Sequence, residues 1–172
     1  GTVSAKIDDT EAAKIVPANI KKNVEIFGQV VAYEGTDTLE QYFANTLTSV
    51  ADSSATSLMG SFFLGKTALE SASFLNVTSI GTYLFQNCSA LVQASFPSLT
   101  TIPDWTFYNC LCLASVTIPD SVTSIKDKAF YGCTSLTSVY CKATTPPTGG
   151  PNMFDSNASD RKIYVPRNSV EA

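Results

Sequence analysis

Apolar residues recur along the chain at fixed intervals. Three stretches align in one register and share the pattern I-x4-F-x2-C-x2-L-x2-(A/V)-x-(F/I/C), with spacings of 22 and then 23 residues in every column. A repeat of this kind indicates a stacked architecture, because one unit is too small to bury its own apolar face. Its four columns are Ile80, Ile102 and Ile125; Phe85, Phe107 and Phe130; Cys88, Cys110 and Cys133; and Leu91, Leu113 and Leu136.

Weaker copies of the unit flank these three. Upstream, Leu58 continues the isoleucine column and Lys66 stands where the repeat has cysteine. Leu47 marks a shortened copy before them, and Phe154, 24 residues after the last phenylalanine of the column, marks another at the far end. We therefore expect four well-formed coils over residues 58–141 and one degraded coil on each side.

Each unit contains the elements of one coil. The alternating (A/V)-x-(F/I) pair predicts a strand with one face inward, ended by Pro97 or Pro119. The I-x4-F-x2-C-x2-L part predicts a short helical or 3₁₀ turn packed onto that strand, and residues 121–125 start a second extended piece. The sequence thus predicts a repeat solenoid with a parallel ladder of strands. About six coils at ~4.8 Å each would give a stack roughly 25–30 Å long.

The first part of the chain does not carry the repeat. Residues 10–16 predict a short helix that Pro17 stops, and residues 23–33 alternate as a strand does. Residues 38–41 predict a capping box that opens a second helix. We expect a small α/β segment over residues 1–46 that caps the solenoid or attaches it to something else.

The repeat resembles the BspA-like leucine-rich repeat of bacterial surface and secreted proteins. Residues 121–139, SVTSIKDKAFYGCTSLTSV, typify the unit, and residues 162–172, KIYVPRNSVEA, are similar to the closing segment of that family. The resemblance implies a right-handed leucine-rich-repeat coil with repeats of 22–24 residues over 47–166, followed by a short tail, 167–172, which we expect to be truncated. It also implies an adhesion or ligand-binding scaffold with no catalytic residues.

A second resemblance covers residues 18–28, ANIKKNVEIFG, which are similar to a motif of phage and prophage tail-associated proteins. It implies an alternative function as a structural or receptor-recognition component of a virion tail, with residues 1–50 serving attachment and a trimeric assembly. The surface-protein function favours a monomer at the cell surface or in the medium. The chain itself starts without the apolar segment of a signal peptide.

Composition excludes several other functions. Apolar residues make up 44% and charged residues 15%, which indicates an ordered domain. A net charge of −4 argues against nucleic acid or an anionic membrane as the partner, and no run approaches the ~20 apolar residues of a membrane span. The chain has no histidine, which removes Ser-His-Asp triads, Cys-His dyads and histidine-bound metals. We predict a protein that is not an enzyme and uses no cofactor or metal.

One motif points to nucleotide binding. Residues 60–67, GSFFLGKT, match the phosphate-loop pattern G-x4-G-K-[ST], which must follow a buried strand and open a helix. The preceding residues 51–57 do not form a hydrophobic strand, and the repeat register assigns Phe63 and Leu69 to the core. We therefore expect no nucleotide site here.

Cysteines and carboxylates are interpreted as structural. Cys88, Cys110 and Cys133 share a column, so we expect reduced thiols in the core. Only Cys110 and Cys112 are close in sequence, which is not the spacing of a soft-metal site. Residues 71–103 carry no charge. The next aspartates occupy turn positions and are expected to be caps and turn formers: Asp104, Asp120 and Asp127.

The outward positions of the strands form the first candidate binding surface, which is neutral and rich in hydroxyl groups. It is either a solvated sheet face or a surface that hydrogen-bonds a glycan or an extended peptide. Its positions are Ser71, Ser73, Gln93, Ser95, Ser115, Thr117, Ser138 and Tyr140, with Thr78, Thr100 and Thr123 in the second extended piece.

Aromatic columns on the turn side form the second candidate surface. Tyr83 and Trp105 share one column, and Tyr108 and Tyr131 share another. These rings either stack on sugars and anchor a protein partner or pack over the edges of the coils. We predict a non-catalytic adhesion module that binds a host protein or glycan through Gln93, Ser95, Ser115, Thr117, Ser138, Tyr140, Trp105, Tyr108 and Tyr131.

Overall fold

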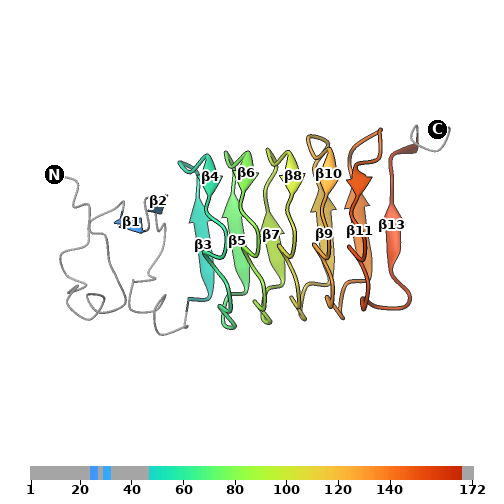
Figure 1. Ribbon diagram of the computed structural model, residues 1–172, viewed down its shortest axis with the longest axis horizontal. Coiled ribbons are helices and arrows are strands. Elements are labelled where there is room, and N and C mark those ends of the chain that lie inside the picture. Colours follow the sequence, from blue (N-terminus) through green and yellow to red (C-terminus); the bar gives the residue numbers. More distant parts are fainter. Residues whose placement is uncertain (1–23, 27–28, 32–46, 168–172) are drawn as a thin grey trace.

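A computed structural model describes residues 24–26, 29–31 and 47–167 of the chain (Figure 1). Residues 47–167 wind into a solenoid of about five turns, as the repeat predicts. The long strands lie side by side along its axis: β3 (Ser49–Asp52), β5 (Ser71–Phe74), β7 (Gln93–Ser95), β9 (Ser115–Ile118), β11 (Ser138–Cys141) and β13 (Lys162–Tyr164). Short strands form a second row: β4 (Ser57–Leu58), β6 (Ser79–Ile80), β8 (Thr101–Ile102), β10 (Ser124–Ile125) and β12 (Thr148–Gly149).

The register of the strands follows from the repeat length. Every hydrogen-bonded pair of neighbouring coils is parallel, and residues 22 to 24 apart in sequence lie opposite each other, as Ser115 and Ser138 do. In β9 the side chains of Val116 and Ile118 are buried while Ser115 and Thr117 are exposed. The alternating pattern of the sequence therefore orients every coil in the same way.

Phenylalanine rings form the centre of the core. Five rings from successive coils stack with nearly parallel planes, at centroid distances of 5.2, 5.5, 5.1 and 5.3 Å: Phe63, Phe85, Phe107, Phe130 and Phe154. The leucine, isoleucine and cysteine columns are buried beside them. Stacked apolar columns thus replace the single compact core of an ordinary domain.

The segment between strands is built from turns. Among the described residues there is no α-helix; the amide groups of Gln86, Cys88 and Leu91 instead donate to the carbonyl groups three residues before them. The reason is that each coil has two left-handed residues four positions apart, such as Tyr83 with a φ of 62° and Asn87 with a φ of 61°. Of the helical or 3₁₀ turn that the spacing predicts, the structure shows only 3₁₀-type turns.

The threonines of the second extended piece are hydrogen-bonded between coils. The hydroxyl of Thr100 donates to the carbonyl of Thr78 at 3.1 Å, and that of Thr123 donates to the carbonyl of Thr100 at 3.4 Å. Thr78 and Thr148 make the same bond to the coil before them. This column, expected to belong to the outward polar surface, therefore joins the coils.

The N-terminal part differs from the expected single strand over 23–33. The structure has two short strands, β1 (Val24–Ile26) and β2 (Gln29–Val31), paired antiparallel. Gly28 lies between them in the sequence, and glycine is favoured where a chain reverses direction. The prediction of a single strand rested on the alternating pattern and did not take this glycine into account. The helices expected at 10–16 and 38–41 lie outside the described residues. In the described part of the chain, no helix has the length and apolar character needed to span a membrane.

Candidate binding surfaces

The outward side chains of the long strands form two rows, which we call the strand face. All six strand residues predicted to bind a ligand lie in these rows; four are exposed, and Ser95 and Ser138 are half-buried. The first row contains Ser49, Ser71, Gln93, Ser115, Ser138 and Lys162; the second contains Ala51, Ser73, Ser95, Thr117, Tyr140 and Tyr164.

The ladder of long strands is interrupted in the middle of this face. β7 pairs with β5, and β9 pairs with β11, but no strand pairing joins β7 to β9. In the next coil, the amide groups of Thr137 and Ser138 both donate to the Ala114 carbonyl, at 3.0 and 3.3 Å. Within this described stretch, the equivalent bonds from Ala114 and Ser115 to the Val92 carbonyl are missing. The sequence predicted a continuous ladder, so the break is a finding of the structure.

The core side chains change at the same junction. Ala94 of β7 and Phe96, which follows β7, pack against the core, a small residue followed by a large one. β9 instead places the branched side chains of Val116 and Ile118 inward.

A cleft of about 490 Å³ lies at the break, with residues of β7 on one wall and residues of β9 on the other. Four of the predicted strand residues line it: Gln93, Ser95, Ser115 and Thr117. Asp120 and Lys142 also belong to the lining, and no pattern in the sequence indicated that either is part of a site. They contribute one charge of each sign, so the lining has no net formal charge.

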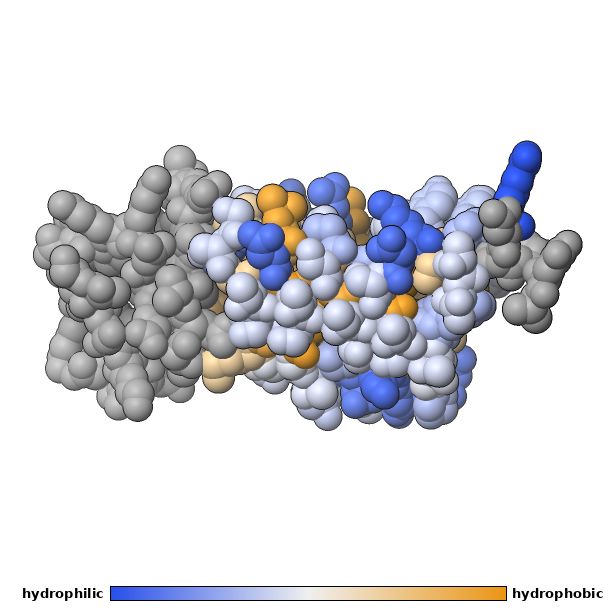
Figure 2. Space-filling model, turned by 90° about the horizontal axis from the view of Figure 1, so that it is seen from above, coloured by the Kyte–Doolittle hydropathy of each residue, from blue (hydrophilic) through white to orange (hydrophobic). Residues whose placement is uncertain are grey.

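The face of the solenoid seen from above is weakly polar. Figure 2 shows the solenoid from above: most of the described surface is pale, and hydrophobic side chains appear in separate places rather than in one band. Such a surface offers hydrogen-bonding groups without the contiguous apolar patch of a large protein interface.

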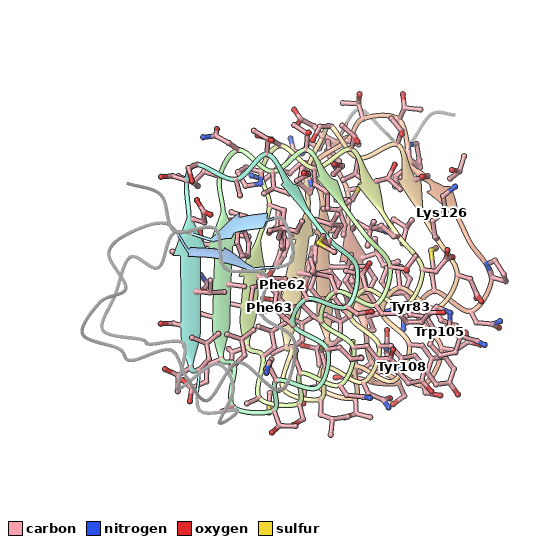
Figure 3. The ribbon with its side chains drawn as sticks, turned by 60° about the vertical axis from the view of Figure 1, so that its left-hand side comes forward. Phe62, Phe63, Tyr83, Trp105, Tyr108 and Lys126 are labelled. Carbon is pink, nitrogen blue, oxygen red and sulfur yellow. The ribbon has the colours of Figure 1, made fainter. Side chains whose placement is uncertain are left out.

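Tyr83, Trp105, Tyr108 and Tyr131 form an aromatic cluster over three coils, with the first three labelled in Figure 3. The ring centroids of Trp105 and Tyr108 are 4.6 Å apart, and those of Tyr108 and Tyr131 are 5.1 Å apart. The Lys128 ammonium lies 4.5 Å from the Trp105 ring. The rings therefore pack against one another over the coil edges, and Tyr83 is the most open of them, at 38% exposure.

Three residues of or beside this cluster have a left-handed backbone conformation: Tyr83, Trp105 and Lys128, with φ of 62°, 59° and 50°. Ser61 and Asn152 have the same conformation at the equivalent place in other coils, so the shape of the coil requires it. A large side chain there costs about 1–2 kcal/mol. Stacking of the rings offsets part of this cost, at about 0.5–1.5 kcal/mol per pair.

The stretch that matches the phosphate-loop pattern is part of the solenoid. The amide groups of Ser61, Phe63 and Gly65 donate to carbonyl groups of the next coil at 2.9, 3.0 and 2.8 Å, so they are not open to a phosphate. Phe62 and Phe63 are buried (Figure 3). Burial also lowers the pKa of Lys66. The expectation that this motif forms no nucleotide site agrees with this geometry.

The cysteine column is buried, as the repeat predicts. The thiols of Cys88, Cys110 and Cys133 donate to carbonyl groups of the preceding coil at 2.9, 3.2 and 3.1 Å. Burial raises the pKa of Cys88 and Cys133 to about 12 and that of Cys110 well above its usual range. All five cysteines are free, and Cys112 is exposed. These buried thiols remain protonated and are poor nucleophiles.

Two of the described carboxylates accept backbone amide groups. The Asp104 carboxylate accepts the Asp127 amide of the next coil at 2.9 Å, so it joins two coils rather than closing a local turn. Asp52 accepts the amide groups of Ser54 and Ala55, which closes the turn after β3. Within residues 47–167, no group of three or more cysteine, aspartate or glutamate side chains could hold a metal ion.

Comparisons with known proteins agree with this fold. The sequence pattern of the BspA type leucine rich repeat region matches residues 56–171 in six copies. No curated protein matches the chain. The solved structure of a leucine rich repeat protein from T. pallidum matches with a TM-score of 0.63 and 23% identity over 68% of this chain. A leucine rich cell surface protein from Faecalibacterium prausnitzii matches with a TM-score of 0.66 and 24% identity over 87% of this chain.

A leucine-rich repeat protein from Bacteroides ovatus has a TM-score of 0.50 and 23% identity over 70% of this chain. The chain spans 58%, 41% and 42% of these three proteins, in the order given. Because the family pattern covers more than half of the chain, the chain belongs to the BspA-type leucine-rich repeat family.

Proposed function

We propose that the chain is a non-catalytic binding module of a bacterial cell-surface or secreted protein, and that it engages a host protein or glycan through the strand face. The observation that carries this proposal is the pair of outward rows, in which hydroxyl, amide and tyrosine side chains of successive coils lie in register. A solenoid presents such an extended surface without any further element.

The chemistry of the described residues supports binding rather than catalysis. The buried thiols have raised pKa values, and the carboxylates of Asp52 and Asp104 accept backbone amide groups. A reaction would need an acid and a base that converge on one cleft. The location at the cell surface draws support from the F. prausnitzii protein, which is described as a leucine rich cell surface protein.

The proposed organisation has three parts. Residues 1–46 cap or attach the solenoid, residues 47–166 form the binding module, and residues 167–172 form a tail. We propose that the chain is a monomer that needs no cofactor. The alternative function in a phage or prophage tail rests on residues 18–28, of which only 24–26 are among the described residues, and no contact there favours it.

A binding screen tests the proposed function. Full-length chain is applied to an array of mammalian glycans and extracellular-matrix proteins, beside two variants that separate the candidate surfaces. Tyr140→Ser with Tyr164→Ser removes the exposed tyrosine pair of the strand face, and Tyr108→Ser opens the aromatic cluster. We expect at least one specific partner, with binding weakened by the first variant and retained by the second. Absence of any partner, or loss only with Tyr108→Ser, contradicts the proposal.

A further inference from the structure

We propose that the cleft between β7 and β9 is a saccharide site that takes one uncharged, hydroxyl-rich sugar unit. The inference rests on the proposed function and names the place and the ligand class. The cleft volume of about 490 Å³ lies within the range of about 300–1,000 Å³ typical of small-molecule sites.

Unpaired backbone groups are the first reason. At the break, the Val92 carbonyl and the amide groups of Ala114 and Ser115 lack the coil-to-coil bonds made at the next junction. Val92, Ala114 and Ser115 all line the cleft. Backbone groups of this kind must bind water or a ligand, and a ligand that supplies both donors and acceptors satisfies them together.

Hydrogen bonds on both sides of the cleft argue against an inserted peptide strand. The Ser121 hydroxyl donates to the Leu99 carbonyl at 2.7 Å beyond one end of the strands, and the Cys112 amide donates to the Ser89 carbonyl at 3.2 Å before the other end. These bonds hold the two coils together on both sides of the cleft. A strand added between β7 and β9 would need a further spacing of about 4.8 Å and would have to break them.

The lining matches the chemistry of a sugar ring. The hydroxyl groups of Ser95, Ser115 and Thr117 and the amide of Gln93 supply both donors and acceptors from the two walls. Pro97 and Pro119 add apolar surface at the ends of the strands, which suits the C–H face of a sugar. The single positive and single negative charge cancel, which favours an uncharged ligand over an acidic one.

An aromatic platform continues the row beside the cleft. Tyr140 lies opposite Thr117, and Tyr164 lies opposite Tyr140, so the row runs from the cleft wall across two further strands. The two tyrosine rings stack at 4.8 Å, and each is 44% exposed. Exposed aromatic rings of this kind stack on sugar faces. A longer oligosaccharide would therefore place one unit in the cleft and the next over these rings.

The test compares cleft variants with variants of exposed strand positions outside the strand face. Neutral oligosaccharides of galactose, glucose, mannose and N-acetylglucosamine are titrated calorimetrically into the full chain. The cleft variant combines Gln93→Leu with Ser115→Val, and the control combines Ser57→Val of β4 with Ser79→Val of β6. Valine is favourable in strands, and thermal unfolding checks that each variant folds. We expect the cleft variant to lose about tenfold or more in affinity and the control less than about twofold, since two hydrogen bonds are removed at the site.

The outcomes separate this inference from the proposed function. Binding of an array protein without any binding of a neutral saccharide overturns the saccharide site and leaves the binding function in place. Equal saccharide affinity in the cleft variant and the control also overturns the site. Binding of neither class overturns both proposals. If a cleft variant fails to fold, the single change Ser95→Ala replaces it, with Ser79→Ala in β6 as its control outside the strand face.

Discussion

Two left-handed positions in each coil decide which residues the turns accept. Gly132, at a φ of +73°, packs against the Asn109 side chain, which itself donates to Asn87 at 3.3 Å. Gly65 has a φ of +69° in another coil, yet no atom lies within 4 Å of the place a Cβ would occupy. The two glycines therefore both have a left-handed backbone conformation, and they differ only in whether there is room for a Cβ atom.

This difference gives a matched pair of substitutions. Gly65→Ala should cost about 1–2 kcal/mol, the penalty for an L residue in the left-handed region. Gly132→Ala should cost about 1 kcal/mol more, because its Cβ would displace Asn109 and break the bond to Asn87. Urea unfolding of both variants measures the difference. Equal losses in the two variants would show that the asparagine contact is irrelevant.

The cysteine column predicts selective alkylation. Iodoacetamide at pH 8.5 should modify exposed Cys112 quickly and reach Cys88, Cys110 and Cys133 only as the protein unfolds, because these three thiols are buried and protonated. Mass spectrometry of peptides from native and urea-unfolded protein gives the rates. Rapid modification of the column in native protein would contradict the assigned burial.

The same thiols predict how stability depends on pH. The folded pKa of Cys133 is about 12, above its ordinary value of 9.0, so the folded state holds the proton more tightly. The contribution of the protonated Cys133 thiol to the free energy of unfolding is complete below pH 9 and decreases as the pH rises toward 12. Unfolding free energies between pH 8 and 11 should fall less steeply for Cys133→Ala than for Cys112→Ala. Parallel curves for the two variants would show that the raised pKa of Cys133 does not cause the loss of stability at high pH.

At the scale of elements, the phenylalanine column predicts a graded cost along the solenoid. Phe107 is 3% exposed and stacks on a ring at each side, so Phe107→Ala should cost about 3–5 kcal/mol. Phe154 is half-buried and stacks on one aromatic ring, that of Phe130, with the Arg161 guanidinium over it at 4.9 Å, so Phe154→Ala should cost about 1–2 kcal/mol. Chemical denaturation compares them. A larger loss at Phe154 would contradict the assigned packing.

The broken ladder makes a second prediction at this scale. The amide hydrogens of Ala114 and Ser115 should exchange with solvent faster than those of Thr137 and Ser138, which occupy the same positions in the next coil and donate to the Ala114 carbonyl. Hydrogen exchange followed by nuclear magnetic resonance resolves the four amides. Equal protection of the two pairs would mean that the ladder is continuous in solution.

The elements also show what the sequence could and could not predict. Alternation in β9 correctly placed Ser115 and Thr117 outward, because a strand has only two faces. The cleft was not predictable in the same way, since it lies where two neighbouring long strands do not pair although the repeat spacing predicts that they do. The change from Ala94 and Phe96 to Val116 and Ile118 is visible in the sequence, but it has no spacing that marks it as a break.

For the whole molecule, the repeat length alone was sufficient to predict the solenoid, because equal spacings bring equal positions into register. The hydrogen-bonded neighbours of individual side chains were not predictable from it. The hydroxyl of Thr100, expected on the outward polar surface, instead donates to the preceding coil. Trp105, expected on the turn side, is there but packs against Tyr108 and Lys128. Its part in binding stays a prediction.

The most direct test of the account is a titration of isotopically labelled full-length chain with the tightest-binding neutral oligosaccharide, followed by amide chemical shifts. We predict that the largest shifts occur on both walls of the cleft, at Ala94, Ser95, Ala114 and Ser115, and that the aromatic cluster around Trp105 is unaffected. Shifts confined to the aromatic cluster, or no shifts at saturating saccharide, would contradict the assignment of the cleft as the binding site.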